Sequence, residues 1–391
     1  MSSVKNAFFK LLGAIEEGFD AVRNRFQKPL LKIKGIRIVP YKGFSNGTSL
    51  FLKGRVIRNP FIFVPRDKAS RWRNLKDTYR RFTTQEMAGV QVELRWNKSI
   101  HIATTDEEGY FTFQLEDLPQ SNSSVMIWGK LDLRLVTQTA DEPAITAADI
   151  LIPPASAQFG VISDIDDTVL VSNATHKLRM AKLAFFYNAR TRLPFEGVAS
   201  FYQALQKGTS AGVFNPIFYV SSSPWNLFDM LTEFFTWQKI PQGPLMLKDI
   251  GISRTQVGGA SHHTHKLAQI KLIMSMYPNL PFILIGDSGQ HDPEIYRQVV
   301  LDYPGRILAI YIRDVSKDKR DLEVETIISS IANSSVPMFL IPDTEAAAQH
   351  AAANGWIARE EIAEVKEEIS ETKKDVSPSF LQPGNMTEEE G

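Results

Sequence analysis

Short apolar segments alternate with amphipathic segments through the second half of the chain. The apolar segments are typical of strands buried on both faces, and they lie near residues 159–163, 216–220, 245–248, 282–286 and 307–312. Between them, apolar residues recur at helical spacing in segments such as 197–206, 226–236 and 266–276. The alternation predicts an α/β domain with a doubly wound, mainly parallel sheet over residues 151–342.

The first half of the chain has the pattern of β-structure. Short segments with alternating apolar positions follow one another between residues 35 and 137, and Thr105–Gly109 is a hairpin turn signal between two of them. We therefore expect a small β-sandwich over residues 35–150. Pro153–Ala157 then serves as the linker to the α/β domain, which the sandwich supports or orients.

A basic helical insertion at residues 66–81 stands out within this β domain. Trp72 and Tyr79 are interleaved with arginines and lysines there, a combination that can bind anionic lipid headgroups. The alternative interpretation is a solvated helix whose aromatic residues pack on the sandwich.

The two ends of the chain predict helices of different character. Residues 1–34 contain an amphipathic helix at 4–27, either a membrane-surface helix or, as we favour, one whose phenylalanines pack on the protein itself. Residues 343–391 read as an acidic tail. It begins with an alanine-rich helix, continues through Glu360–Glu371 and ends in a segment expected to be disordered.

Composition narrows the class of protein. The 391 residues carry a formal net charge of zero, which argues against bulk electrostatic binding of nucleic acid. Cysteine is absent, so disulfides, zinc–thiolate sites and cysteine catalysis are excluded. Glu16, Glu17 and Asp20 interrupt the first apolar stretch, which is therefore no signal peptide. We expect a cytoplasmic protein, peripheral at a membrane if its basic helices bind lipid.

Two aspartates follow the strand predicted at 159–163. Asp164 and Asp166 lie two residues apart, with Thr168 next in the same spacing. Carboxylates this close repel each other unless a cation lies between them or one is protonated. The carboxyl ends of parallel strands are where α/β sheets bind ligands.

Polar residues occur at three further places, each just after a predicted strand or at the start of a predicted helix. Ser221 and Ser222 end the strand at 216–220, with Ser223 as the expected N-cap and Pro224 as the first residue of a helix that could hold phosphate. Asp287 and Asp292 follow the strand at 282–286 and complete a site for a hard cation. Lys266 opens a helix between these strands, where its ammonium could neutralise phosphate charge.

Together, these residues resemble the four motifs of the haloacid dehalogenase (HAD) superfamily. More narrowly, Phe159–Thr168, Tyr219–Trp225, His265–Lys266 and Leu284–Tyr296 are similar to the catalytic domain of the actin-patch-associated phosphatidate phosphatases of fungi and their bacterial relatives. The similarity covers roughly residues 150–335. It implies a HAD-like, Mg²⁺-dependent phosphatase with an aspartyl-phosphate intermediate and a phosphorylated lipid as substrate.

The resemblance also implies a role for each residue. Asp164 is the expected nucleophile and Asp166 the acid and base, while Mg²⁺ is expected on Asp164, the Asp166 backbone carbonyl and Asp287, with Asp292 as a further ligand. The expected contacts to the phosphoryl oxygens are Ser221, Lys266 and Thr168, with Ser222 as the alternative to Ser221.

Other interpretations remain open at this stage. The spacing of the motifs leaves no room for a large cap domain, and an open site suits a lipid or macromolecular phosphate. A basic apolar segment at 173–188 could contact a bilayer, although packing on the sheet explains it as well. The same chemistry on a soluble phosphoester or phosphoprotein is the nearest alternative, and a non-catalytic membrane-binding scaffold is the remote one. We regard His262, His263 and His265 as surface or substrate contacts rather than ligands of a transition metal, and Arg313 as part of a structural ion pair.

Overall fold

The computed structural model describes residues 36–58, 85–119, 127–136, 145–170, 194–249, 259–315, 319–334 and 336–375. The expected helices at 4–27 and 66–81 and the segment at 173–188 lie outside these residues, as do 376–391 and the side chain of His262. Within the described residues, no helix is long and apolar enough to cross a membrane.

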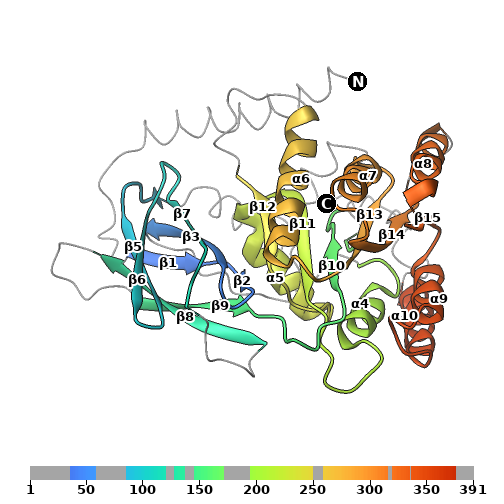
Figure 1. The fold of residues 1–391 in the computed structure, drawn as a ribbon, viewed down its shortest axis with the longest axis horizontal. Coiled ribbons are helices and arrows are strands. Elements are labelled where there is room, and N and C mark those ends of the chain that lie inside the picture. Colours follow the sequence, from blue (N-terminus) through green and yellow to red (C-terminus); the bar gives the residue numbers. More distant parts are fainter. Residues whose placement is uncertain are drawn as a thin grey trace, which may run out of the picture.

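A six-stranded parallel sheet forms the centre of the second half of the chain (Figure 1). Its strand order is β12-β11-β10-β13-β14-β15, and every neighbouring pair is parallel. The strands are β10 (Gly160–Ser163), β11 (Ile217–Pro224), β12 (Leu245–Lys248), β13 (Phe282–Asp287), β14 (Ile307–Arg313) and β15 (Met338–Ile341). β10 lies between β11 and β13, so the residues after these three strands meet at one edge of the sheet.

Helices cover both faces of this sheet. They are α4 (Val198–Lys207), α5 (Phe228–Trp237), α6 (Gly259–Met276), α7 (Asp292–Asp302), α8 (Lys319–Ser330), α9 (Thr344–Ala353) and α10 (Glu361–Asp375), with short 3₁₀ turns at Trp225–Leu227 and Ala332–Ser334. Helices α4, α5, α9 and α10 share one apolar cluster with Val161, whereas α6, α7 and α8 share the other with Ile162. Neighbouring strand residues point to opposite faces, so each strand contributes to both clusters.

A nine-stranded sheet precedes the parallel one. Its strands are β1 (Ile36–Pro40), β2 (Gly43–Ser45), β3 (Leu50–Arg58), β4 (Gln85–Glu86), β5 (Gln91–Trp96), β6 (Ser99–Thr104), β7 (Tyr110–Leu115), β8 (Trp128–Val136) and β9 (Ile145–Leu151). All described pairs are antiparallel except β2 with β9. Side chains from both ends of the sheet meet in one apolar cluster, so the sheet folds around its own core. The prediction of a doubly wound, mainly parallel α/β domain preceded by a small β-sandwich is confirmed as a parallel six-stranded sheet with interleaved helices, preceded by a mainly antiparallel β domain.

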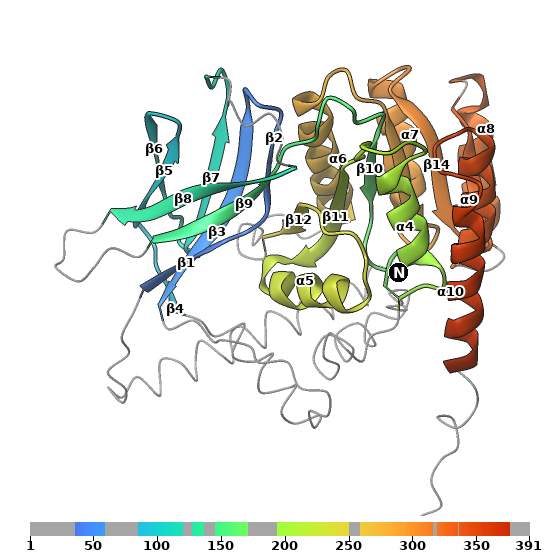
Figure 2. The same ribbon diagram turned by 90° about the horizontal axis from the view of Figure 1, so that it is seen from below.

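The β domain packs directly on the α/β domain (Figure 2). The ring of Tyr41 stacks on Trp225 with centroids 4.3 Å apart, and Phe44 contacts Phe218 at 5.4 Å. The Tyr277 hydroxyl donates a hydrogen bond of 3.2 Å to the carbonyl of Ser45. These side chains are buried, and the β domain thereby contributes Tyr41 to one apolar cluster of the α/β domain and Phe44 to the other.

The C-terminal helices α9 and α10 belong to the α/β core. Ala347, Ala351 and Val365 are buried in the same cluster as α4. The Glu368 carboxylate accepts hydrogen bonds from the backbone N–H groups of Ala199 and Ser200 at the start of α4, at 3.3 and 2.7 Å. Residues 344–375, which the sequence analysis placed in a separate tail, thus help to build the α/β domain.

Candidate active site

Asp164 lies directly after β10, at the carboxyl edge of the parallel sheet. Its backbone N–H donates to the carbonyl of Ile285 on β13 at 2.9 Å, which fixes the start of the following loop. The loop then turns sharply: the N–H groups of Val169 and Leu170 both donate to Ile165. Asp167 takes the left-handed conformation at φ 59°, which aspartate tolerates better than most residues. Asp164 and Asp166 are consequently presented at the same edge.

Three carboxylates meet at this edge. One oxygen each of Asp164, Asp287 and Asp292 lies within 4.8 Å of the others, and all three side chains are buried. Asp287 ends β13, and Asp292 begins α7 after a short turn. A glycine at position 286 makes this approach possible, because a Cβ there would lie 2.6 Å from the Asp292 Oδ2 atom.

The side chain of Lys266 on α6 extends into this cluster of three carboxylates. Its Nζ atom lies 2.8 Å from Asp164 Oδ1 and 2.5 Å from Asp292 Oδ1, and the side chain is only 4% exposed. Burial alone would lower the pKa of this ammonium, but Asp164 and Asp292 raise it above its ordinary value. Lys266 therefore stays charged throughout the physiological range.

One ammonium does not neutralise three carboxylates. Burial raises the pKa of Asp164 well above its usual range, and the pKa of Asp287 is raised for the same reason, with repulsion from Asp292 adding to it. Among the described residues, Asp164 Oδ1 has no hydrogen-bond partner and only the Lys266 ion pair. A buried, electron-rich group of carboxylate oxygens fits a hard divalent cation such as Mg²⁺. Asp164, Asp287 and Asp292 are the residues that could hold it.

Asp166 is held by serines of β11. Its Oδ2 atom accepts hydrogen bonds from Ser221 Oγ at 2.9 Å and from Ser223 Oγ at 2.8 Å. Positions 221 and 223 share one face of the strand, so the half-buried Ser222 points to the other. The expected role of Ser223 as a helix N-cap is wrong, because β11 continues through Pro224 and the Ser223 hydroxyl is used by Asp166.

Two further residues donate hydrogen bonds to the aspartates of this site. The Thr168 hydroxyl donates to Asp164 Oδ2 at 3.3 Å. The side-chain amide of Gln290 donates to the Asp166 carbonyl and to Asp287 Oδ2, both at 3.1 Å. Sequence analysis did not single out Gln290; the signal that could have identified it is its place in the turn between Asp287 and Asp292.

The other candidate residues lie away from this group. The carboxylate cluster is the one group arranged for a metal ion among the described residues, and neither His263 nor His265 belongs to it. Arg313 is buried beside Phe195, 4.3 Å from the ring centroid, and donates to Thr344 Oγ1 at 2.7 Å. The structure thus describes a hydrogen bond and a cation–π contact for Arg313, and the expected ion pair with Asp314 or a neighbour stays a prediction.

Comparison with known proteins finds a family resemblance in the segment that contains this geometry. Residues 159–314 match the family model described as "Phosphatidate phosphatase APP1, catalytic domain". The family resemblance is confirmed for this segment. All the residues of the cluster, Lys266 included, lie within it.

Two curated relatives extend the match only partly. Phosphatidate phosphatase APP1 of Saccharomyces cerevisiae is 34% identical over 191 residues, which cover 47% of this chain and 32% of the relative. An uncharacterized protein of Schizosaccharomyces pombe is 27% identical over 268 residues, covering 66% of this chain and 41% of the relative. The matches thus span less than half of either relative's length. Among solved structures, a Pnkp1/Rnl/Hen1 complex chain aligns at 13% identity with a TM-score of 0.24, over 59% of this chain and 54% of its own, too distant to bear on the fold.

Proposed function

We propose that this protein is a Mg²⁺-dependent phosphatase that works through an aspartyl-phosphate intermediate on phosphatidate or a related lipid phosphate monoester. The observation that carries the proposal is the contact of Asp164 with Lys266 beside Asp287 and Asp292, inside the segment that matches the APP1 catalytic domain. That combination supplies a nucleophile, a fixed cation and a metal site at one sheet edge.

In this mechanism an Asp164 carboxylate oxygen attacks phosphorus and forms the aspartyl-phosphate as the bond to the lipid oxygen breaks. Asp166 gives a proton to the departing alkoxide and then takes one from the water that hydrolyses the intermediate. Ser223 holds the Asp166 carboxyl in place for both steps.

Charge neutralisation is the other requirement of phosphoryl transfer. A bound Mg²⁺ would neutralise charge on the phosphoryl oxygens. It would be held by Asp164, Asp287 and the Asp166 carbonyl, with Asp292 nearby. Lys266 would hold both Asp164 and the incoming phosphate, and Thr168 would orient Asp164. Ser221 is the proposed phosphate contact and Ser222 its alternative; the two lie on opposite faces of β11, so only one of them can face the phosphate.

We also propose that residues 35–150 serve as an accessory domain and residues 151–342 as the phosphatase domain, on which α9 and α10 of the segment 343–391 pack. A lipid substrate implies contact with a membrane surface. The same chemistry on a soluble phosphoester or phosphoprotein is the alternative, and dependence on lipid surface area separates the two.

The test is phosphate release by the full chain from phosphatidate in mixed micelles, with and without Mg²⁺, beside a small chromogenic phosphate ester. Asp164→Asn keeps the shape of the side chain and removes the nucleophile, so release should fall by at least about a thousandfold. Mg²⁺-dependent release from phosphatidate, well above the ester rate and lost in the variant, supports the proposal. Release from the ester alone would keep the mechanism and refute the lipid substrate. Release from neither would favour a non-catalytic scaffold.

A further inference from the structure

Arg320, near the start of α8, holds the turn that follows β13. Its Nε atom donates to the Ser288 carbonyl at 2.9 Å and its Nη2 atom to the Gln290 carbonyl at 2.7 Å. The other bonds of the guanidinium go to Glu294 and Glu323. Arg320 lies outside residues 159–314, the part of the chain that the family model matches.

The turn that Arg320 holds supplies hydrogen bonds to Asp287 and to the Asp166 carbonyl. Gln290 donates from its backbone to Asp287 Oδ1 at 2.8 Å and from its side chain to Asp287 Oδ2 and the Asp166 carbonyl. Ser288 also binds the end of β14. Its backbone N–H donates to the Arg313 carbonyl, and its hydroxyl accepts a hydrogen bond from the backbone N–H of Val315. The position of Gln290 thus depends on a guanidinium two contacts away from Asp287.

We propose that Arg320 is a positioning residue for the metal site: it fixes the 288–290 turn so that Gln290 aligns Asp287 and the Asp166 carbonyl as ligands. The inference rests on the proposed function only for the catalytic meaning of the metal, because binding of the ion can be measured without turnover. Outer partners of metal ligands commonly change metal affinity about 10- to 100-fold when they are removed.

The geometry requires an arginine. A guanidinium presents its donors in one plane, so Arg320 reaches two backbone carbonyls and both oxygens of Glu294 at once. The two hydrogen bonds to Glu294 also fix the orientation of the Arg320 guanidinium. A lysine keeps the positive charge but cannot span these acceptors.

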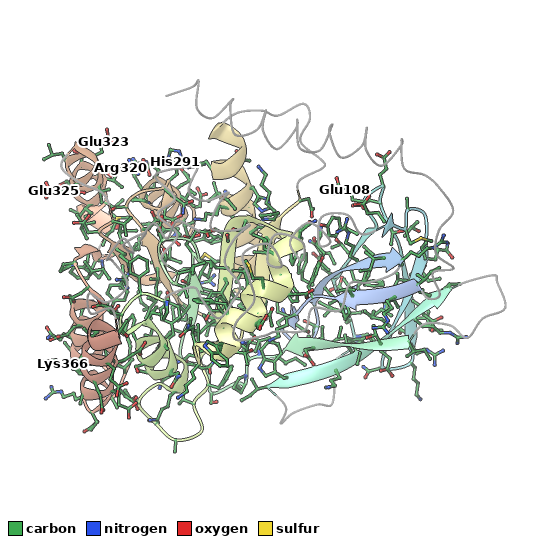
Figure 3. All side chains as sticks on the ribbon, turned by 180° about the vertical axis from the view of Figure 1, so that it is seen from behind. Glu108, His291, Arg320, Glu323, Glu325 and Lys366 are labelled. Carbon is green, nitrogen blue, oxygen red and sulfur yellow. The ribbon has the colours of Figure 1, made fainter. Side chains whose placement is uncertain are left out.

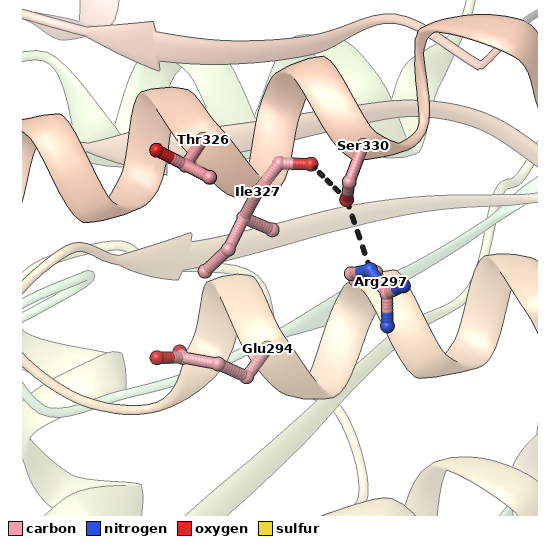
Figure 4. Close-up of a pocket in the computed structure, with 5 residues that line it drawn as sticks. All are labelled: Glu294, Arg297, Thr326, Ile327 and Ser330. Atoms are coloured by element: carbon pink, nitrogen blue, oxygen red, sulfur yellow. Dashed lines mark hydrogen bonds between the residues drawn. The ribbon is translucent and has the colours of Figure 1, made fainter.

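Arg297 on α7 offers a matched control. Its Nε atom donates to Ser330 Oγ at 2.9 Å across a shallow groove between α7 and α8 (Figure 4). Glu294 lines the same groove, one helical turn away on α7. Arg320, by contrast, contacts the 288–290 turn and lies beside His291 (Figure 3). Substitution of Arg297 removes an arginine from the same pair of helices without touching the turn.

The experiment measures Mg²⁺ binding by calorimetry on the full chain, together with the Mg²⁺ concentration that gives half-maximal phosphate release. Arg320→Met should weaken Mg²⁺ about 10- to 100-fold while kcat at saturating Mg²⁺ falls far less. Arg320→Lys should show most of the same loss, and Arg297→Met should stay within about twofold of the parent. An unchanged Kd in folded Arg320→Met or Arg320→Lys overturns the proposal.

Gln290→Ala provides the second arm, and remains informative if Arg320→Met fails to fold. Gln290 is half-buried, and its loss should reproduce the weakening because Arg320 acts through it. The double variant Arg320→Lys/Gln290→Ala should therefore have a Kd for Mg²⁺ no higher than the higher Kd of the two single variants. Additive losses of binding free energy would refute the coupling. Asp287→Asn should abolish binding. Mg²⁺ binding without phosphate release would leave the role of Arg320 standing and defeat the proposed function alone, whereas a parent chain that does not bind Mg²⁺ defeats both.

Discussion

Lys266 is the residue on which the charge balance of the site depends. It is the only ammonium within ion-pair distance of Asp164 and Asp292 among the described side chains. Lys266→Met leaves buried carboxylates unpaired, and we expect a loss of about 3–5 kcal/mol in the free energy of unfolding at pH 8 without metal. Lys271→Met is the control on the same helix, since Lys271 is 43% exposed and paired with Asp302. Its loss should stay below about 1 kcal/mol.

The deficit of Lys266→Met should shrink as the pH falls. Burial raises the pKa of Asp164 and Asp287 above their unfolded values, so the native state holds more protons than the unfolded state between the two values. Stability from these groups is present at low pH and is lost as the pH rises through the native pKa. Removal of Lys266 extends this effect, because the ammonium lowers the pKa of both groups. Denaturant unfolding in EDTA at pH 5 and pH 8 measures it, and equal stability of the two lysine variants at pH 8 would contradict the expectation.

Among single residues, those that directly follow a strand could be predicted from the sequence. Asp164 and Asp287 could be placed because each follows an apolar segment of a parallel sheet, and the register of neighbouring strands then brings them together. Ser223 and Gln290 were not predictable in this way. Their partner Asp166 lies 57 and 124 residues away along the chain, and a serine before a proline fits a helix start equally well. Only the strand continuing through Pro224 decides between the two.

Helix α4 shows how one element completes another. Its N-cap is Gly197, which has no side chain to accept the first N–H groups, and Glu368 of α10 accepts two of them instead. Glu368→Ala should therefore cost about 1 kcal/mol in the free energy of unfolding, the usual effect of losing an N-terminal cap. Glu367→Ala removes an exposed neighbour on the same helix and should be nearly neutral. Chemical denaturation of the two variants compares them, and equal losses would argue against the cap.

The same pair of helices explains why the C-terminal assignment from sequence was incomplete. Helix α10 is dense in Glu and Lys, which is typical of a solvated segment. Its apolar residues are few, but Ile362, Val365 and Ile369 recur at helical spacing and pack on the core. The alanines of α9 are too small to mark a buried face by their hydrophobicity alone. Both helices become recognisable as core elements only when α4 is placed against them.

At the scale of the whole molecule, the contact between the two domains was beyond the reach of sequence patterns. Lys53 of β3 forms a 2.8 Å ion pair with Asp249, just after β12, and its ammonium also lies over the Tyr110 ring at 4.9 Å. Each domain shows its own periodicity, and that periodicity fixes which side chains are buried but not which outer faces meet. The β domain is thereby tied to the carboxyl edge of the parallel sheet, where the carboxylate cluster lies.

Glu108 of the β domain is affected by the charge of Asp249 in the α/β domain, and we expect it to make stability depend on pH. Burial, with repulsion from Asp106 and Asp249 opposed by Arg55, raises the pKa of Glu108 from 4.5 to about 7. The native state then binds more protons than the unfolded state between about pH 4.5 and pH 7, so the contribution of Glu108 is full at low pH and is lost as the pH rises through 7.

Glu108→Gln should remove this dependence. Its Tm should decline less than that of the parent chain between pH 5 and pH 8, and should exceed the parent's at pH 8, because a neutral amide replaces an ionised group in a partly buried place. Figure 3 shows Glu108 far from Arg320 and His291, so the effect is separable from the metal site. Glu107→Gln alters the exposed neighbour in the same turn and should keep the parent's decline. Calorimetric scans in EDTA at four pH values compare the three proteins. If the two variants decline in parallel, the pH dependence arises elsewhere, and the interface is held by its aromatic contacts and the Lys53–Asp249 pair irrespective of pH.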